Sequence, residues 1–193
     1  MEYFTSDWHL GHKRIIELSE RPFSSLNEMK LSLLDNTLSI LKKDDTLFML
    51  GDFSFKKEET EYALSALKDA GIHFFWVLGN HDEKNAKEKY KNFCEKISSG
   101  YFFSRDGYRI FLSHFPHLFW NESQKNSWSL FGHVHIHSPE MEAMKQLSFS
   151  KKMMNVNCEL HNYKPVSLEE VRKEMEQKDD NLEFLFAIKR SIL

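Results

Sequence analysis

A short polar segment, Gly79-Asn80-His81-Asp82, follows the apolar run 73–78. Six residues rich in aromatic and branched side chains predict a buried strand. The Asn80 amide oxygen can ligate a hard cation, His81 can carry a proton at neutral pH, and Asp82 can hold the His81 ring in one tautomer. The segment therefore predicts a site at the carboxyl edge of a sheet.

Four other apolar runs end in the same kinds of residue. After the first run, Asp7 and His9 are two residues apart, so on an extended backbone both side chains project from one face. A single histidine at a strand end is more often hydrogen-bonded than a ligand. Five of the ten histidines lie at these ends, however, and their joint placement favours metal binding. The residues concerned are Asp7, His9, Asp52, Asn80, His81, His114, His133 and His135.

The donor types narrow the choice of metal. Imidazoles, carboxylates and one amide without a thiolate do not suit a structural zinc site. They suit a pair of divalent cations of intermediate hardness, such as Mn²⁺, Fe²⁺ or Zn²⁺.

The elements that must position these residues alternate along the first half of the chain. Strands are predicted at 3–6, 46–50, 73–78, 129–131 and 154–160, with a hairpin over 101–113 that turns at Asp106-Gly107. Capping boxes predict helices over 25–43 and 167–177, and helices are also predicted over 57–68 and 83–96. Residues 182–193 fit a helix or a strand. Both parallel and antiparallel strand pairs are expected.

Composition excludes several classes of protein. The 193 residues fit one domain, and a hydrophobic share of 41% excludes a disordered chain. A net charge of −3 gives no basic field for duplex nucleic acid or an anionic membrane, so neither partner is expected. Two unpatterned cysteines, no leader-like start and no long apolar window predict a cytoplasmic protein.

Taken together, the motifs resemble those of the calcineurin-like metallophosphoesterases, in the family's order from residue 7 to residue 135. They are Asp7-x-His9, Gly51-Asp52, Gly79-Asn80-His81-Asp82, His114 and Gly132-His133-x-His135. The opening segment 4–12 also resembles small single-domain bacterial and phage members. The resemblance implies one metallophosphoesterase domain over 1–193, built as a four-layer α/β/β/α sandwich with two mixed sheets and the metal site at the carboxyl ends of strands.

The resemblance also implies a role for each site residue. Asp7, His9 and His135 would hold one ion, and Asn80, His114 and His133 the other. Asp52 would bridge the two ions, His81 would be the catalytic histidine, and Asp82 would orient it. Mn²⁺ is the favoured metal, with Fe²⁺, Zn²⁺ or Ni²⁺ as alternatives. His12 and Arg14 are candidate substrate contacts, along with Lys13, although ordinary surface charge at a helix start explains them equally well.

The implied activity is phosphoester hydrolysis by a metal-bridging hydroxide, with His81 protonating or hydrogen-bonding the departing oxygen. A phosphodiesterase acting on nucleotide-like or other small substrates is favoured. The alternatives are a phosphomonoesterase or protein phosphatase, then a nuclease, then a catalytically silent scaffold. The chain departs from the family pattern at Phe55, where many members have a second aspartate, and at Phe115, where many have glycine.

Overall fold

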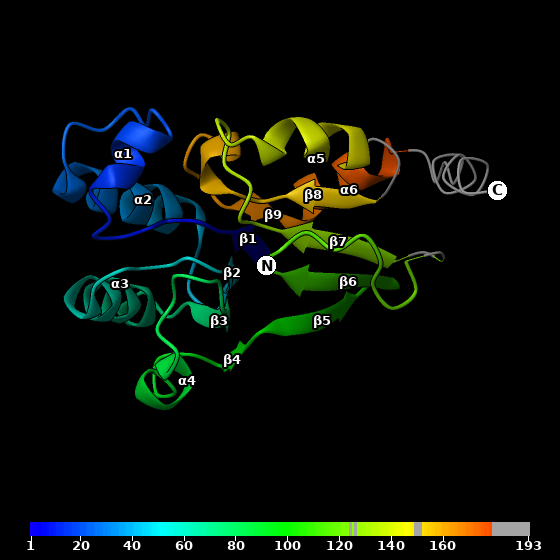
Figure 1. Ribbon diagram of the computed structural model, residues 1–193. Coiled ribbons are helices and arrows are strands. Elements are labelled where there is room, and N and C mark those ends of the chain that lie inside the picture. The colour runs from blue at the N-terminus through cyan, green and yellow to red at the C-terminus, as the bar shows by residue number, and fades with distance from the viewer. Residues whose placement is uncertain (124, 126, 149–151, 179–193) are drawn as a thin grey trace.

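The computed structural model describes residues 1–123, 125, 127–148 and 152–178, which form two β-sheets with helices packed against them (Figure 1). The first sheet has the strand order β4-β3-β2-β1-β9. Strands β1 to β4 are parallel and β9 is antiparallel to β1, so the carboxyl ends of four strands share one edge. These strands are β1 (Glu2–Thr5), β2 (Thr46–Leu50), β3 (His73–Val77), β4 (Lys96–Ser98) and β9 (Val166–Ser167).

The second sheet has the order β5-β6-β7-β8 and is also mixed. Its first two strands form the predicted antiparallel hairpin, and Asp106 and Gly107 both have positive φ, as a tight hairpin turn requires. The remaining pairs are parallel. The strands are β5 (Gly100–Arg105), β6 (Tyr108–Ser113), β7 (Ser127–Phe131) and β8 (Met153–Asn155). The predicted α/β class with two mixed sheets is confirmed.

Three buried apolar clusters join the layers. Leu33 of α2 and Leu64 of α3 pack against the outer face of the first sheet, whereas Phe48 and Leu130 meet between the two sheets. Met144 of α5 packs on the outer face of the second sheet. The helices are α1 (Arg14–Leu18), α2 (Leu26–Ile40), α3 (Lys57–Asp69), α4 (Ala86–Lys89), α5 (Glu140–Ser148) and α6 (Leu168–Glu176).

Helix starts follow the sequence signals. The Ser25 hydroxyl accepts a hydrogen bond from the Glu28 amide at 3.1 Å and begins α2. At α6, Ser167 and Glu170 cap each other's backbone amides in a complete capping box.

Two predicted elements differ from the structure. Within 83–96 only α4 is helical, because Tyr90 is buried against Trp76 and the chain then turns into β4. Strand β8 ends at Asn155, and a 3₁₀ helix follows at Cys158–His161, with the Asn157 side chain accepting from the Glu159 amide. Helix α5 was not predicted, and α1 was anticipated only as a helix start near residues 12–14. Residues 182–193 lie outside the described part of the chain.

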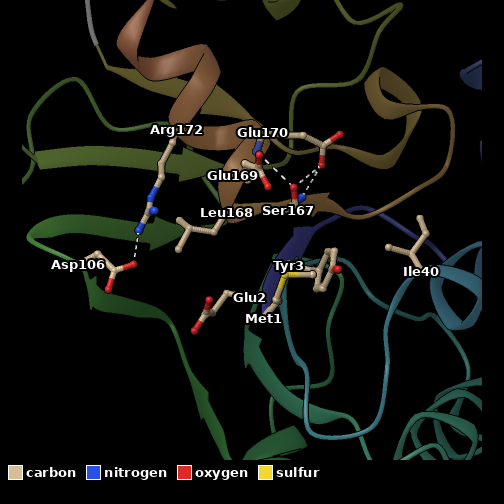
Figure 2. A pocket seen from close by; sticks show the side chains of 10 residues that line it. All are labelled: Met1, Glu2, Tyr3, Ile40, Asp106, Ser167, Leu168, Glu169, Glu170 and Arg172. Carbon is tan, nitrogen blue, oxygen red and sulfur yellow. Dashed lines mark hydrogen bonds and ion pairs between the residues drawn. The ribbon is translucent and has the colours of Figure 1, made fainter.

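A cavity of about 570 Å³ lies at the amino end of β1, the end opposite the predicted ligands (Figure 2). Tyr3, Ser167 and Arg172 line it, and Arg172 forms an ion pair with Asp106, which also lines it. None of the residues predicted for the metal site lines this cavity. Among the described residues, no helix combines the length and apolar character needed to cross a bilayer.

Candidate metal centre

The chain segments that follow β1 and β2 stay hydrogen-bonded beyond the ends of the strands. The amide of Asp7 donates to Gly51 O at 3.0 Å and the amide of His9 donates to Asp52 O at 2.9 Å. Leu10 then bridges to Ser54 in parallel fashion. This extended pairing holds the ligands predicted after β1 beside the ligand predicted after β2.

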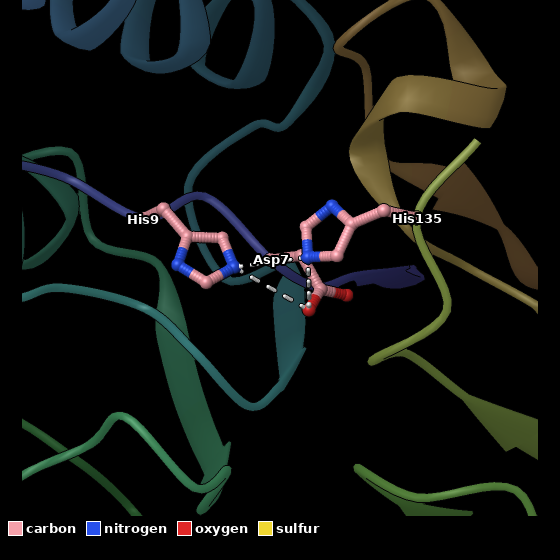
Figure 3. A group of neighbouring side chains, drawn as sticks. All are labelled: Asp7, His9 and His135. Carbon is pink, nitrogen blue, oxygen red and sulfur yellow. Dashed lines mark hydrogen bonds and ion pairs between the residues drawn. The ribbon is translucent and has the colours of Figure 1, made fainter. Parts of the chain in front are cut away.

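Asp7, His9 and His135 form a first group whose ligand atoms all lie within 4.8 Å of one another (Figure 3). The Nε2 atoms of His9 and His135 are 3.2 Å apart, and each lies 3.8 Å from Asp7 Oδ1. Asp7 and His9 are buried. The structure thus brings together two neighbouring residues and one residue that is 126 positions away from His9.

The first group converges by a different backbone path from the one predicted. Asp7 and His9 have φ values of 59° and 52°, so they lie in the left-handed region and not on an extended strand. Asp52 and His133 also have positive φ. Such conformations are costly for residues other than glycine and are concentrated at functional sites. Here the Asp7 carboxylate compensates in part by accepting from the His133 amide at 3.0 Å and from the Ser6 hydroxyl at 2.5 Å.

Asp52, His114 and His133 form a second group that meets the same 4.8 Å limit. Asn80 joins it, because its Oδ1 lies 3.0 Å from His114 Nε2. Asp52 Oδ2 lies 3.4 Å from His114 Nε2 and 3.6 Å from His9 Nε2. One carboxylate oxygen therefore faces both groups, as a bridging ligand must.

The donor atoms fit divalent metal ions. Two imidazoles on one ion, with bonds of about 2.1 Å, have nitrogens about 3.0–3.4 Å apart, which matches the 3.2 Å between His9 and His135. His114 Nδ1 donates to Leu50 O at 2.9 Å, which leaves Nε2 to face Asp52 as a free ligand atom. A Cβ on Gly51 would overlap the His114 ring, so only glycine permits this approach.

The sequence comparison identifies the family. A model of the calcineurin-like phosphoesterases matches residues 3–179.

This chain belongs to the calcineurin-like phosphoesterase family.

Membership of this family, with the two ligand groups, supports a metal-dependent hydrolase of phosphoric esters.

The similar proteins have comparable length. Uncharacterized protein MJ1445 of Methanocaldococcus jannaschii is 28% identical over 175 residues, which cover 91% of each chain. The gene 66 protein of Mycobacterium phage L5 is 29% identical and covers 71% of this chain and 77% of its own. The crystal structure of AQ665 from Aquifex aeolicus, a protein of unknown function, superposes with a TM-score of 0.70 at 30% identity and covers 90% of this chain and 98% of its own.

Burial and neighbouring charges shift the pKa values of the residues in the two candidate ligand groups. Burial raises the pKa of Asp7 to about 6. Burial also disfavours charge on Asp52 and His114, but their mutual ion pair prevails, so the pKa of Asp52 falls to about 2 and that of His114 rises to about 9. Burial lowers the pKa of His9 well below its usual value. Without a cation, therefore, protons occupy part of the ligand set.

A buried ion pair behind the first group was not predicted. Glu159 Oε1 accepts from His135 Nδ1 at 2.8 Å and from Arg21 at 2.7 Å. Arg21 also donates to the backbone carbonyls of Asp7 and Trp8, at 2.7 and 3.0 Å. Burial alone would raise the pKa of Glu159, but His135 and Arg21 lower it to about 2. No local pattern links Arg21 to Glu159, which are 138 residues apart.

His81 lies beside both groups, but Asp82 does not orient it. The His81 amide donates to Asp52 Oδ1 at 2.9 Å, and its exposed ring lies 5.6 Å from the His9 ring. The buried Asp82 carboxylate instead accepts from the amides of Asp52 and Phe53, as well as from the Gly79 amide and the Trp76 ring nitrogen. The orienting role predicted for Asp82 is therefore wrong. Its carboxylate fixes the loops that follow β2 and β3.

The three candidate substrate contacts, His12, Lys13 and Arg14, lie at the start of α1, with Lys13 as its N-cap. His12 is half-buried, and its ring centroid is 5.7 Å from that of His9. Arg14 is exposed as the first residue of α1. Their contact with a substrate stays a prediction.

Proposed function

We propose that this protein is a dinuclear, metal-dependent phosphodiesterase that hydrolyses small phosphodiesters, with Mn²⁺ as its working metal. The observation that supports it most is the position of Asp52 Oδ2, 3.6 Å from a histidine of one ligand group and 3.4 Å from a histidine of the other. Two adjacent ligand groups that share a carboxylate can hold a pair of metal ions close together. Such pairs catalyse in-line displacement at phosphorus, because they stabilise both the attacking and the leaving oxygen.

In this proposal each group holds one divalent ion. Asp7, His9 and His135 would hold the first, and Asn80, His114 and His133 would hold the second, with Asp52 available to both. When bound, such a pair supplies a water nucleophile of lowered pKa and neutralises charge on the phosphoryl oxygens. The buried residues keep bulk water away from their side of the pair and fix the ligand positions.

His81 is the residue we assign to the leaving group. Its ring is exposed next to the ligand residues, whereas most of the other site imidazoles are turned into the two groups. As the bond between phosphorus and the departing oxygen breaks, a protonated His81 ring can give its N–H proton to that oxygen. The resulting alcohol then leaves with the proton.

Two features favour a small diester over a monoester. The exposed ring of Phe115 lies against His133 and His114, at centroid distances of 4.5 and 5.0 Å, and offers an apolar contact to a second esterified group. The Arg21 guanidinium is held by Glu159 and by backbone carbonyls, so it is not available to balance the additional charge of a monoester.

The test combines metal analysis with hydrolysis of a diester and a monoester by the purified protein in Mn²⁺. We expect about two metal ions per chain and faster turnover of the diester. His133→Asn should lose metal and activity, whereas His137→Asn, which changes an exposed histidine paired with Glu20, should lose neither. A wide preference for the monoester would assign the protein to the phosphomonoesterases. If the protein binds no metal and hydrolyses neither ester, the catalytically silent scaffold would be favoured.

A further inference from the structure

Four aromatic rings gather on one side of the candidate metal centre. Phe55 stacks on His12, with ring centroids 4.1 Å apart and an interplanar angle of 15°, and on His81, at 4.7 Å and 30°. The His9 ring lies 5.5 Å from Phe55 and 5.6 Å from His81. Phe55 is thus the ring that contacts each of the three histidines.

The His81 ring needs such a neighbour, because its hydrogen bonds do not fix its orientation. In the described part of the chain, His81 is held by its backbone amide, which donates to Asp52, and the Asp82 carboxylate is turned to other partners. A histidine ring without a hydrogen-bonded partner can rotate about its two side-chain torsions. Contact with the face of Phe55 restricts that rotation.

Phe55 is itself held firmly, although it is 38% exposed. Its amide donates to Leu10 O at 2.8 Å, as the last hydrogen bond between the segments that follow β1 and β2. His12, on the first of those segments, stacks almost flat against the ring. The backbone pairing that aligns the metal ligands therefore also fixes the ring beside His81.

We propose that Phe55 is the positioning residue for His81: ring stacking, and not a carboxylate, directs the His81 imidazole toward the leaving oxygen. This inference rests on the proposed function, in which His81 protonates that oxygen. It also gives a role to the residue at which the chain departs from the family's second aspartate.

The first experiment uses leaving groups that differ in their need for a proton. Ethyl p-nitrophenyl phosphate and ethyl phenyl phosphate share the ethyl group and differ in the leaving group. Nitrophenolate leaves readily as an anion, whereas phenolate needs a proton to leave. In the Mn²⁺-loaded protein, Phe55→Leu should lower kcat about ten-fold or more for the phenyl ester and less than about three-fold for the nitrophenyl ester. Phe55→Tyr, which keeps the aromatic ring, should hydrolyse the phenyl ester with a kcat close to that of the unmodified protein. Tyr62→Leu changes an exposed aromatic residue on α3 and is the matched control, with both rates unchanged.

A double mutant shows whether Phe55 acts through His81. On the phenyl ester, Phe55→Leu in a His81→Asn background should cause no further loss, because the group that it positions is already gone. Metal content should stay at two per chain in each variant. Equal losses on both esters, additive losses in the double mutant, or loss of metal would overturn the proposal.

A spectroscopic measurement separates this inference from the proposed function. In the Zn²⁺-loaded protein, the ring current of Phe55 should shift the His81 ring proton signals, and Phe55→Leu should remove that shift while Phe55→Tyr keeps it. If no ester is hydrolysed but the shift behaves as described, the proposed function fails and the stacking stands. If esters are hydrolysed but Phe55→Leu leaves the His81 signals unmoved, the positioning role fails alone.

Discussion

Glu159 Oε1 lies 2.8 Å from His135 Nδ1, on the side of the imidazole opposite the atom that faces Asp7 and His9. This carboxylate fixes the His135 tautomer so that Nε2 carries the lone pair toward the first ligand group. Partners of this kind orient metal ligands and raise their basicity, so we expect Glu159 to act on the candidate site through His135.

Replacing Glu159 with Gln should weaken Mn²⁺ binding at the first group by about 10–100-fold, because the His135 ring loses a charged acceptor. Calorimetric titration of the metal-free protein measures this change directly. Glu20→Gln, which alters an exposed carboxylate near His137, is the control and should bind Mn²⁺ as the unmodified protein does. Unchanged affinity in Glu159→Gln would mean that the hydrogen bond does not tune the ligand.

Replacing Arg21 with Met should lower the free energy of unfolding by about 3–5 kcal/mol, because Glu159 is left buried without its cation. Urea unfolding of the metal-free protein measures the loss. Lys57→Met breaks an exposed pair with Glu61 and should cost less than about 1 kcal/mol. Comparable losses in the two variants would contradict the structural role of the buried pair.

Replacing His81 with Asn or Ala should lower turnover by about 10²–10⁴-fold, because the leaving oxygen loses its proton donor. Metal analysis should still find two ions per chain, since His81 lies outside both ligand groups. Loss of metal together with activity would show that His81 is a ligand.

Metal affinity should rise with pH. In the metal-free protein Asp7 has a pKa of about 6 and His114 a pKa of about 9, so each still holds a proton below these values. A cation must displace those protons, so binding at pH 5.5 should release protons from both residues, whereas binding at pH 7 should release mainly the proton of His114. Asp52, with a pKa of about 2, contributes no such dependence. Titrations at pH 5.5, 7 and 8.5 measure the trend, and a Kd that does not vary with pH would contradict these protonation states.

The sequence is most informative where local chemistry decides the structure. Apolar runs predict the strands, Ser25 and Ser167 predict helix starts, and Asp106-Gly107 predicts the hairpin turn. The candidate metal ligands are recognisable because each follows a strand, and parallel strands share a carboxyl edge. That reasoning holds even where the expected backbone conformation is wrong. Asp7 and His9 were expected on an extended backbone, but both have left-handed φ values and their side chains still converge.

The sequence is least informative where contacts join distant segments. Arg21 and Glu159 meet only after the chain has folded, and nothing near either residue marks the pair. Asp82 shows the opposite error, because a carboxylate next to a histidine in sequence turns instead to the amides of Asp52 and Phe53. The amphipathic stretch 83–96 fails as a helix because burying Tyr90 and pairing β4 outweigh its local propensity.

Crystals grown with Mn²⁺ and measured at a wavelength where manganese scatters anomalously test the central claim most directly. The account predicts two anomalous peaks, one among Asp7, His9 and His135 and one among Asn80, His114 and His133, both in contact with Asp52. A single peak, or peaks away from Asp52, would contradict a dinuclear centre at these residues.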